Sequence, residues 1–152
     1  MNRIWIFFLI FFAAFFNAQD LKDFRTLLQK GENSESASEL LIQTSKKAFE
    51  KSRKPIFEAF FAVGNFFMAK HATNPISKYA YFNKGKKALN NAVIKDPVNL
   101  EIRFMRYLSQ ESSPALLGYK TNLAADKKFI LLEVKKSTDE ALIRRIKNHF
   151  KI

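Results

Sequence analysis

The stretch PIFEAFFAVGNFFMAKH, residues 55–71, decides the fold. Pro55 suits the first turn of a helix, and the large apolar residues that follow cover a wide arc of the helical wheel. We therefore predict a central helix that is buried on most sides. Gly64 lies inside it, where glycine costs about 1 kcal/mol relative to alanine. Close approach of a neighbouring helix would offset that cost.

Prolines divide the rest of the chain into helix-sized intervals. Pro55, Pro75, Pro97 and Pro114 are separated by 20, 22 and 17 residues, and each interval fits one helix and a turn. The chain shows little of the period-two alternation that is typical of strands. The pattern predicts an all-α protein.

The flanking helices have recognisable starts and apolar faces. We expect helices over 21–30, 37–52, 76–95 and 99–111, one that begins after Asn122, and a last one that begins after Ser137. Ser36 with Glu39, and Ser137 with Glu140, have the spacing of capping boxes, and Asn122 is an expected cap. The side chains expected to face inward on helix 76–95 are Tyr79, Phe82, Leu89, Ala92 and Val93. The last helix carries the stripe Leu142, Ile143, Ile146 and Phe150, which we expect to pack on the core.

Residues 1–18 resemble a secretory signal peptide. Arg3 precedes an apolar run from Ile4 to Phe16, and Ala18-Gln19 offers a small residue before a polar start. A bilayer-spanning helix needs about 20 apolar residues, so this run is short for a retained anchor. We predict cleavage near Ala18, which leaves residues 19–152 as a single exported domain in the periplasm or outside the cell.

The composition limits the chemistry and favours anionic partners. The chain has no cysteine, which excludes disulfides and an N-terminal lipid anchor on cysteine. Its 26 Lys and Arg residues against 14 Asp and Glu residues give a formal net charge of +12. Such a charge favours contact with phosphate polymers, acidic lipids, acidic proteins or polysaccharides. Export argues against nucleic acid as the natural partner.

Residues 85–99, GKKALNNAVIKDPVN, resemble the second helix and exit turn of a tetratricopeptide repeat. Gly85, Leu89, Ala92 and Pro97 stand at suitable offsets, and the match covers one half-repeat. The next helix departs from the repeat, because Arg103 and Arg106 occupy positions where large apolar residues are expected. We expect six or seven antiparallel helices, arranged as a bundle or in a tetratricopeptide-like manner, in a monomer.

The chain also resembles a group of small exported helical proteins of flavobacteria and their relatives. This resemblance implies an envelope location and no particular activity. It rests on residues 66–71, 99–104 with Arg106, 117–119 followed by 126–128, and the N-terminal Asn17-Ala18-Gln19.

No catalytic, cofactor-binding or metal-binding motif is present in the sequence. His71 is expected at a helix C-terminus, where the dipole favours it, and His149 is expected to be exposed. Neither histidine has an evident serine or carboxylate partner, and no zinc spacing occurs. Glu101, Asp126 and Glu133 would form a carboxylate set only if the fold brought them together.

Arg103 and Arg106 are the sharpest local feature, one turn apart on an otherwise apolar helix. Such a pair can bind a carboxylate or phosphate. We favour internal pairing with Glu101, Asp126 or helix-end carbonyl groups.

Other basic residues gather on helix faces, where they are either solvated or contact a partner. The candidates for contact with an anion or partner are Arg103, Arg106, Lys84, Lys86, Lys87, Arg144 and Arg145. A second cluster, expected to be solvated, comprises Lys46, Lys47, Lys51, Arg53 and Lys54.

These observations predict a non-enzymatic exported envelope protein that binds another macromolecule through a concave or basic helical face. The first alternative is a peripheral binder of anionic membrane or polysaccharide. The second is a hydrolase whose site the sequence does not reveal.

Overall fold

The structure is a computed structural model that describes residues 21–152, and the predicted signal peptide at 1–18 lies outside this range. The described residues are helical from 21 to 31 and then form six further α-helices and one 3-10 turn, with no strand among them. The predicted all-α fold is confirmed, whereas the antiparallel, repeat-like order stays a prediction. The elements after residue 31 are α2 (Glu35–Ser52), α3 (Pro55–His71), α4 (Pro75–Lys95), α5 (Leu100–Ser112), η1 (Ala115–Leu117), α6 (Leu123–Glu133) and α7 (Glu140–Phe150).

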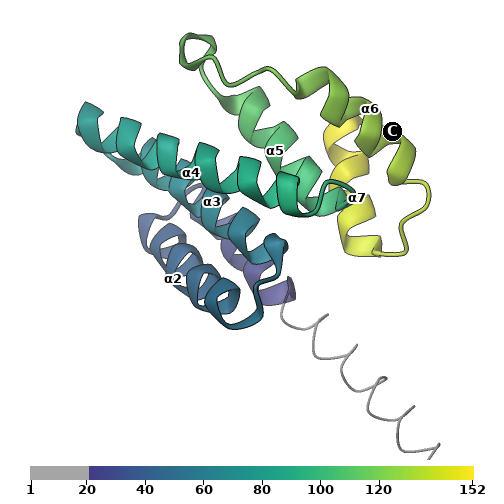
Figure 1. Ribbon diagram of the computed structural model, residues 1–152, viewed down its shortest axis with the longest axis horizontal. Coiled ribbons are helices and arrows are strands. Elements are labelled where there is room, and N and C mark those ends of the chain that lie inside the picture. Colours follow the sequence, from purple (N-terminus) through teal and green to yellow (C-terminus); the bar gives the residue numbers. More distant parts are fainter. Residues whose placement is uncertain (1–20) are drawn as a thin grey trace, which may run out of the picture.

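Helix α3 is the central element, as its sequence predicts, and it packs against α2 on one side and α4 on the other (Figure 1). Glycines permit both contacts. A Cβ on Gly64 would lie 2.7 Å from Ile42 Cγ1 of α2, and a Cβ on Gly85 of α4 would lie 2.9 Å from the carbonyl oxygen of Ala62. The predicted close helix approach at Gly64 is therefore confirmed.

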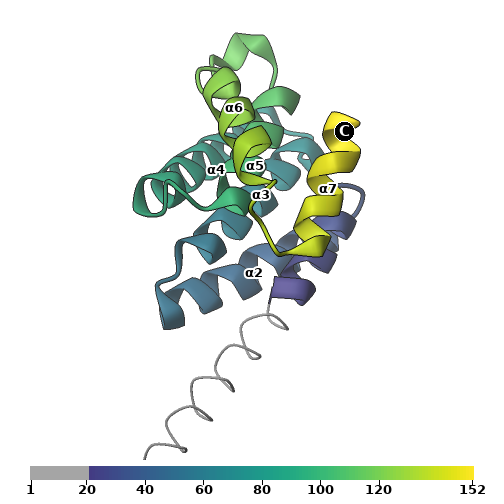
Figure 2. The same ribbon diagram turned by 90° about the vertical axis from the view of Figure 1, so that its right-hand side faces the viewer.

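Two apolar cores share helix α5. The first core lies among residues 21–31, α2, α3, α4 and the side of α5 that carries Ile102 and Met105. The second lies among α5, α6 and α7, where Phe104 and Tyr107 contribute from α5. Figure 1 shows α6 and α7 on the opposite side of α5 from α2, and Figure 2 shows α7 to the right of α5 and α6. The stripe of α7 packs into this second core, with Leu142 and Ile146 buried as expected.

The cap of α2 is Ser34, so the prediction of Ser36 was wrong. Ser34 has extended backbone angles, and its side chain accepts a hydrogen bond from the Ala37 amide. Ser36 already lies within the first helical turn, where its own backbone cannot adopt the extended cap geometry.

The cap of α7 is Asp139, not Ser137. The Asp139 carboxylate accepts from the Leu142 amide at 3.0 Å, and the Ser137 hydroxyl instead accepts from the Asp139 amide. Asn122 does precede α6, but its side-chain oxygen accepts from Gln110 Nε2 and makes no cap bond. For Asn122, the contact with Gln110 takes the place of the expected cap bond.

Tyr79 was expected to face the core of α4 but is 60% exposed. It lies near the start of α4, at the mouth of an open groove. The other four side chains expected to face inward, Phe82, Leu89, Ala92 and Val93, are buried.

Candidate functional site

The described residues form an apolar groove of about 1000 Å³. Its walls come from the end of helix 21–31, α3, α4, α5, η1 and α7. Most of its surface is formed by large apolar side chains, namely Leu28, Val63, Phe66, Phe67, Tyr79, Phe82, Met105, Leu108, Leu116 and Leu117. A cavity of this size and character suits an apolar ligand or an apolar segment.

Phe66 and Phe82, which line the groove, form an aromatic cluster with Tyr119. Phe66 stacks on Tyr119 at a centroid distance of 5.8 Å and meets Phe82 edge-on at 5.5 Å. Tyr119 is almost completely buried, and its hydroxyl donates to Asn90 Oδ1. Burial raises the pKa of Tyr119 to about 12. The floor is therefore packed and neutral, which favours a groove whose shape exists before a ligand arrives.

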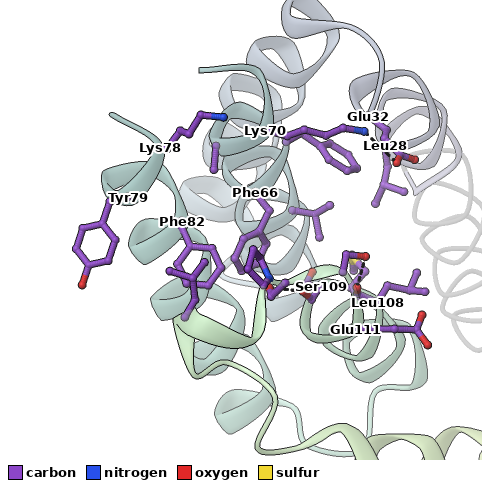
Figure 3. Close-up of a pocket in the computed structure, with 18 of the residues that line it drawn as sticks. Leu28, Glu32, Phe66, Lys70, Lys78, Tyr79, Phe82, Leu108, Ser109 and Glu111 are labelled. Atoms are coloured by element: carbon purple, nitrogen blue, oxygen red, sulfur yellow. Dashed lines mark hydrogen bonds and ion pairs between the residues drawn. The ribbon is translucent and has the colours of Figure 1, made fainter. Parts of the chain in front are cut away.

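Polar groups occupy the edges of the groove (Figure 3). Lys70 forms an ion pair with Glu32 at 3.3 Å, joining α3 to the turn after residue 31. Lys78, on the α4 side, has no ion-pair partner among residues 21–152. Glu111 lies on the opposite side, on α5. An apolar channel with polar edges matches the requirements of an amphipathic segment.

Two large apolar side chains of the groove lie largely in solvent. Leu116 of η1 is 96% exposed, and Tyr79 of α4 is 60% exposed. Leu116 and Tyr79 line the groove itself. Exposed apolar groups that cluster around a concavity are typical of interaction sites, whereas scattered ones are not.

His149 joins a chain of hydrogen-bonding groups at the groove edge. Its Nε2 lies 3.0 Å from Glu111 Oε2, and the Tyr107 hydroxyl donates to Glu111 Oε1 at 2.8 Å. Burial and the bond to Glu111 raise the pKa of Tyr107 to about 12. The expectation that neither histidine has a carboxylate partner was wrong for His149, because α7 folds back beside the end of α5. His71 ends α3 as predicted, with its Nε2 2.9 Å from the carbonyl oxygen of Gly31.

Arg103 and Arg106 pair internally with Asp126, as favoured from the sequence. Arg106 donates to both Asp126 oxygens, at 2.7 and 2.8 Å, and Arg103 donates to one of them and to the Pro97 carbonyl. Asp126 is fully buried. The guanidinium of Arg103 also lies over the Phe129 ring, at 4.3 Å from its centroid. This network fastens α6 to α5.

A second buried carboxylate, Glu101, connects α5 to helix 21–31 and to α7. Glu101 accepts from Arg25 at 2.8 and 2.6 Å and from Arg145 at 3.2 Å, and Arg25 also reaches Asp139. These bonds raise the pKa of Arg25 well above its ordinary value, chiefly through Glu101. Burial lowers the pKa of Arg145. Arg145, which the sequence suggested as a partner contact, thus forms an internal ion pair with Glu101.

The three carboxylates considered as a set do not come together. Glu101 belongs to the Arg25 and Arg145 network and Asp126 to the Arg103 and Arg106 network, and Glu133 pairs with Lys136 at 2.7 Å. Within residues 21–152 no group of three or more His, Cys, Asp or Glu side chains is arranged to hold a metal ion.

The remaining basic candidates lie on helix surfaces. Lys84 and Lys87 of α4 and Arg144 of α7 are exposed, and Lys86 lies 5.5 Å from the centroid of the Tyr119 ring.

The groove and the Arg25 network were not found from the sequence. Leu116 and Leu117 are the residues that could have indicated the groove, because they are apolar and follow Pro114 in a segment with no long helix to bury them.

No protein-family profile, curated protein sequence or solved structure matches this chain. The resemblances noted from the sequence therefore stay predictions. In the part of the chain that the structure describes, no helix is both long and apolar enough to cross a bilayer.

Proposed function

We propose that the protein is an exported, non-enzymatic binding module whose groove holds an apolar, amphipathic segment of a partner protein. The observation that carries the proposal is the groove itself, with about 1000 Å³ of apolar space and exposed Leu116 and Tyr79 at its mouth. Covering these side chains would remove apolar surface from water, which is the main driving force of protein association.

The dimensions favour a short helix as the bound element. A helix with side chains is about 10 Å wide and rises about 5.4 Å per turn, so the groove volume corresponds to two or three turns. Polar groups at both edges, such as Lys70 and Glu111, would face the polar side of the segment. Apolar anchors spaced by three and four residues would reach Phe66, Phe82 and Leu108.

The groove walls are held in place before binding. Arg25, Glu101 and Arg145 connect helix 21–31, α5 and α7, and all three elements contribute to the groove. A preformed site loses less conformational entropy on binding than a flexible one. The buried ion pairs therefore support the proposed function by fixing the distance between the walls.

A blocking substitution tests this proposal. Ala69 of α3 lines the groove, so A69W would fill part of it, whereas A125W places the same side chain on the exposed surface of α6. We expect the wild type and A125W to capture the same partner protein from envelope extract at low salt and at about 1 M salt. A69W should lose that partner while keeping the melting temperature of the wild type. Equal capture by A69W would contradict the proposal.

A fluorescent apolar dye gives a second readout that needs no partner. Anilinonaphthalene sulfonate should bind the native wild type and A125W in the groove, and its fluorescence should fall with A69W. Displacement of the dye by the captured partner would connect the two measurements. Equal dye fluorescence in all three proteins would place the apolar site elsewhere.

A further inference from the structure

The outer face of α4 carries lysines and isolated apolar side chains but no acid. The helix, Pro75–Lys95, contains five lysines and neither aspartate nor glutamate. Lys95 is paired with Glu58 at 2.7 Å and Lys86 lies over Tyr119. Lys84 and Lys87 are exposed, and no carboxylate among the described residues pairs with them.

Two isoleucines lie on one line along this face. Ile76 and Ile94 are 18 residues apart, which is five turns at 3.6 residues per turn, so they point the same way about 27 Å apart. They are 80% and 76% exposed. Ala80 and Lys87 lie close to the same line between them, with Lys84 beside it. Val98, 74% exposed, lies just beyond the end of the helix.

A straight line of this length is suited to a flat partner. We propose that the outer face of α4, defined by Ile76, Ala80, Lys84, Lys87 and Ile94, docks on a bilayer that contains anionic phospholipids. The lysines lie at the level of the head groups, and the isoleucines enter the boundary between head groups and acyl chains. The helix lies along the surface.

The isoleucines favour lipid over a phosphate polymer or an acidic polysaccharide. Each of these partners would attract lysine, but only a bilayer offers apolar material over the whole line at once. The groove uses a different side of α4, through Tyr79 and Phe82. The docking face is therefore independent of the groove proposal, and either can fail without the other.

A single fluorescent label tests the contact locally. Because the chain has no cysteine, A80C provides a unique site on the docking face, and E39C provides one on the exposed surface of α2. An environment-sensitive dye at A80C should brighten and shift to the blue with vesicles of phosphatidylglycerol and phosphatidylethanolamine. It should not respond to phosphatidylcholine vesicles, and the E39C label should respond to neither. No response at A80C, or an equal response at E39C, would overturn the proposal.

Charge reversal then tests the lysines in the same label assay. K84E/K87E should raise the lipid concentration for half of the A80C response by at least about 25-fold, because loss of each lysine costs roughly fivefold at an anionic surface and each added carboxylate is repelled by it. The matched change K46E/K47E on exposed residues of α2 should leave it within about twofold. All variants share the same N-terminal residues, so these do not contribute to the difference. Equal losses in both double variants would overturn the assignment to α4.

Removal of the apolar contacts distinguishes a bilayer from a purely ionic surface. I76S/I94S should weaken the response at least tenfold, whereas L132S, at an exposed leucine of α6, should not. All of these positions are exposed, and unchanged thermal unfolding of each variant confirms that the fold is retained. An I76S/I94S protein that responds like the wild type would overturn docking on a bilayer.

Discussion

The helices before α5 and the helices after it are held together in different ways. Residues 21–31, α2, α3 and α4 pack through small residues and phenylalanines, with Gly64 and Gly85 at the closest approaches. Helices α6 and α7 have a smaller apolar core, and buried ion pairs of Asp126 and Glu101 connect them to α5. Apolar packing thus predominates in the first half, whereas in the second half buried ion pairs add to a smaller apolar core.

The groove lies between these two halves, with walls from helix 21–31, α3 and α4 and from α5, η1 and α7. Helix α5 contributes to both cores and carries Glu101, Arg103 and Arg106. A charged connection requires particular partners and geometry, so it fixes position more sharply than apolar contact alone. The Arg25, Glu101 and Arg145 network thereby connects helix 21–31, α5 and α7, three of the elements that form the groove.

The largest expected effect is at Asp126. D126A would strand the guanidinium groups of Arg103 and Arg106 in a mostly buried site, at a cost of about 3–5 kcal/mol in the free energy of unfolding. The exposed Asp23 provides the control, since D23A should change stability by less than about 0.5 kcal/mol. Denaturant unfolding measures both. A D126A protein as stable as D23A would show that charge does not hold the second half.

The two arginines should differ in importance. R106M removes two bonds to a buried carboxylate and should cost about 3 kcal/mol, because Asp126 loses its bidentate partner. R103M leaves that pair intact, and the guanidinium that it removes is partly solvated, so we expect about 1 kcal/mol. Thermal unfolding of both variants sharpens the comparison. The reverse order would mean that Arg103 is the principal anchor of α6.

The first half should be sensitive to added volume instead of lost charge. G85A places a Cβ 2.9 Å from the Ala62 carbonyl, which can move only if α3 and α4 separate. Overpacking costs about 1–3 kcal/mol, whereas alanine gains about 1 kcal/mol in helix propensity. We therefore expect G85A to be less stable than the wild type. N83A, at an exposed site of the same helix, should be neutral within about 0.5 kcal/mol. If G85A is instead more stable than the wild type, the close approach of α3 and α4 does not limit the fold.

The smallest effect concerns pH. Burial raises the pKa of Asp139, but bonds from Arg25 and from α7 amides outweigh it, so the net pKa lies below the ordinary value. The stability that this group contributes is therefore present above about pH 4 and is lost as the pH falls through the lowered pKa. D139N keeps the cap oxygen but removes the charge. Its stability should fall less steeply than that of the wild type below about pH 4, by less than about 1 kcal/mol because the site is partly exposed.

Part of the fold and one of the two ion-pair networks could be predicted from the sequence. Prolines and apolar periodicity located α3, α4 and α5, and the position of Gly64 indicated close helix contact. Pairing of Arg103 and Arg106 was expected because arginines on an apolar helix need partners, and Asp126 was among the acids considered.

The remaining contacts depend on tertiary geometry that local patterns do not contain. Arg25 reaches Glu101 across 76 residues, and His149 meets Glu111 only because α7 returns to α5. The groove likewise arises from six separate elements. Tyr79, which lines the groove and is exposed, follows the same apolar periodicity as the buried residues of α4. This explains why it was assigned to the core.

Hydrogen exchange of the protein with and without its captured partner tests the central claim, that the groove is the binding site. Amide protection should increase in residues 66–82 and 105–117, which form the groove walls, and stay unchanged in residues 35–52 of α2. The same experiment on A69W should show no added protection. Protection confined to residues 123–150, with 66–82 unchanged, would contradict the account.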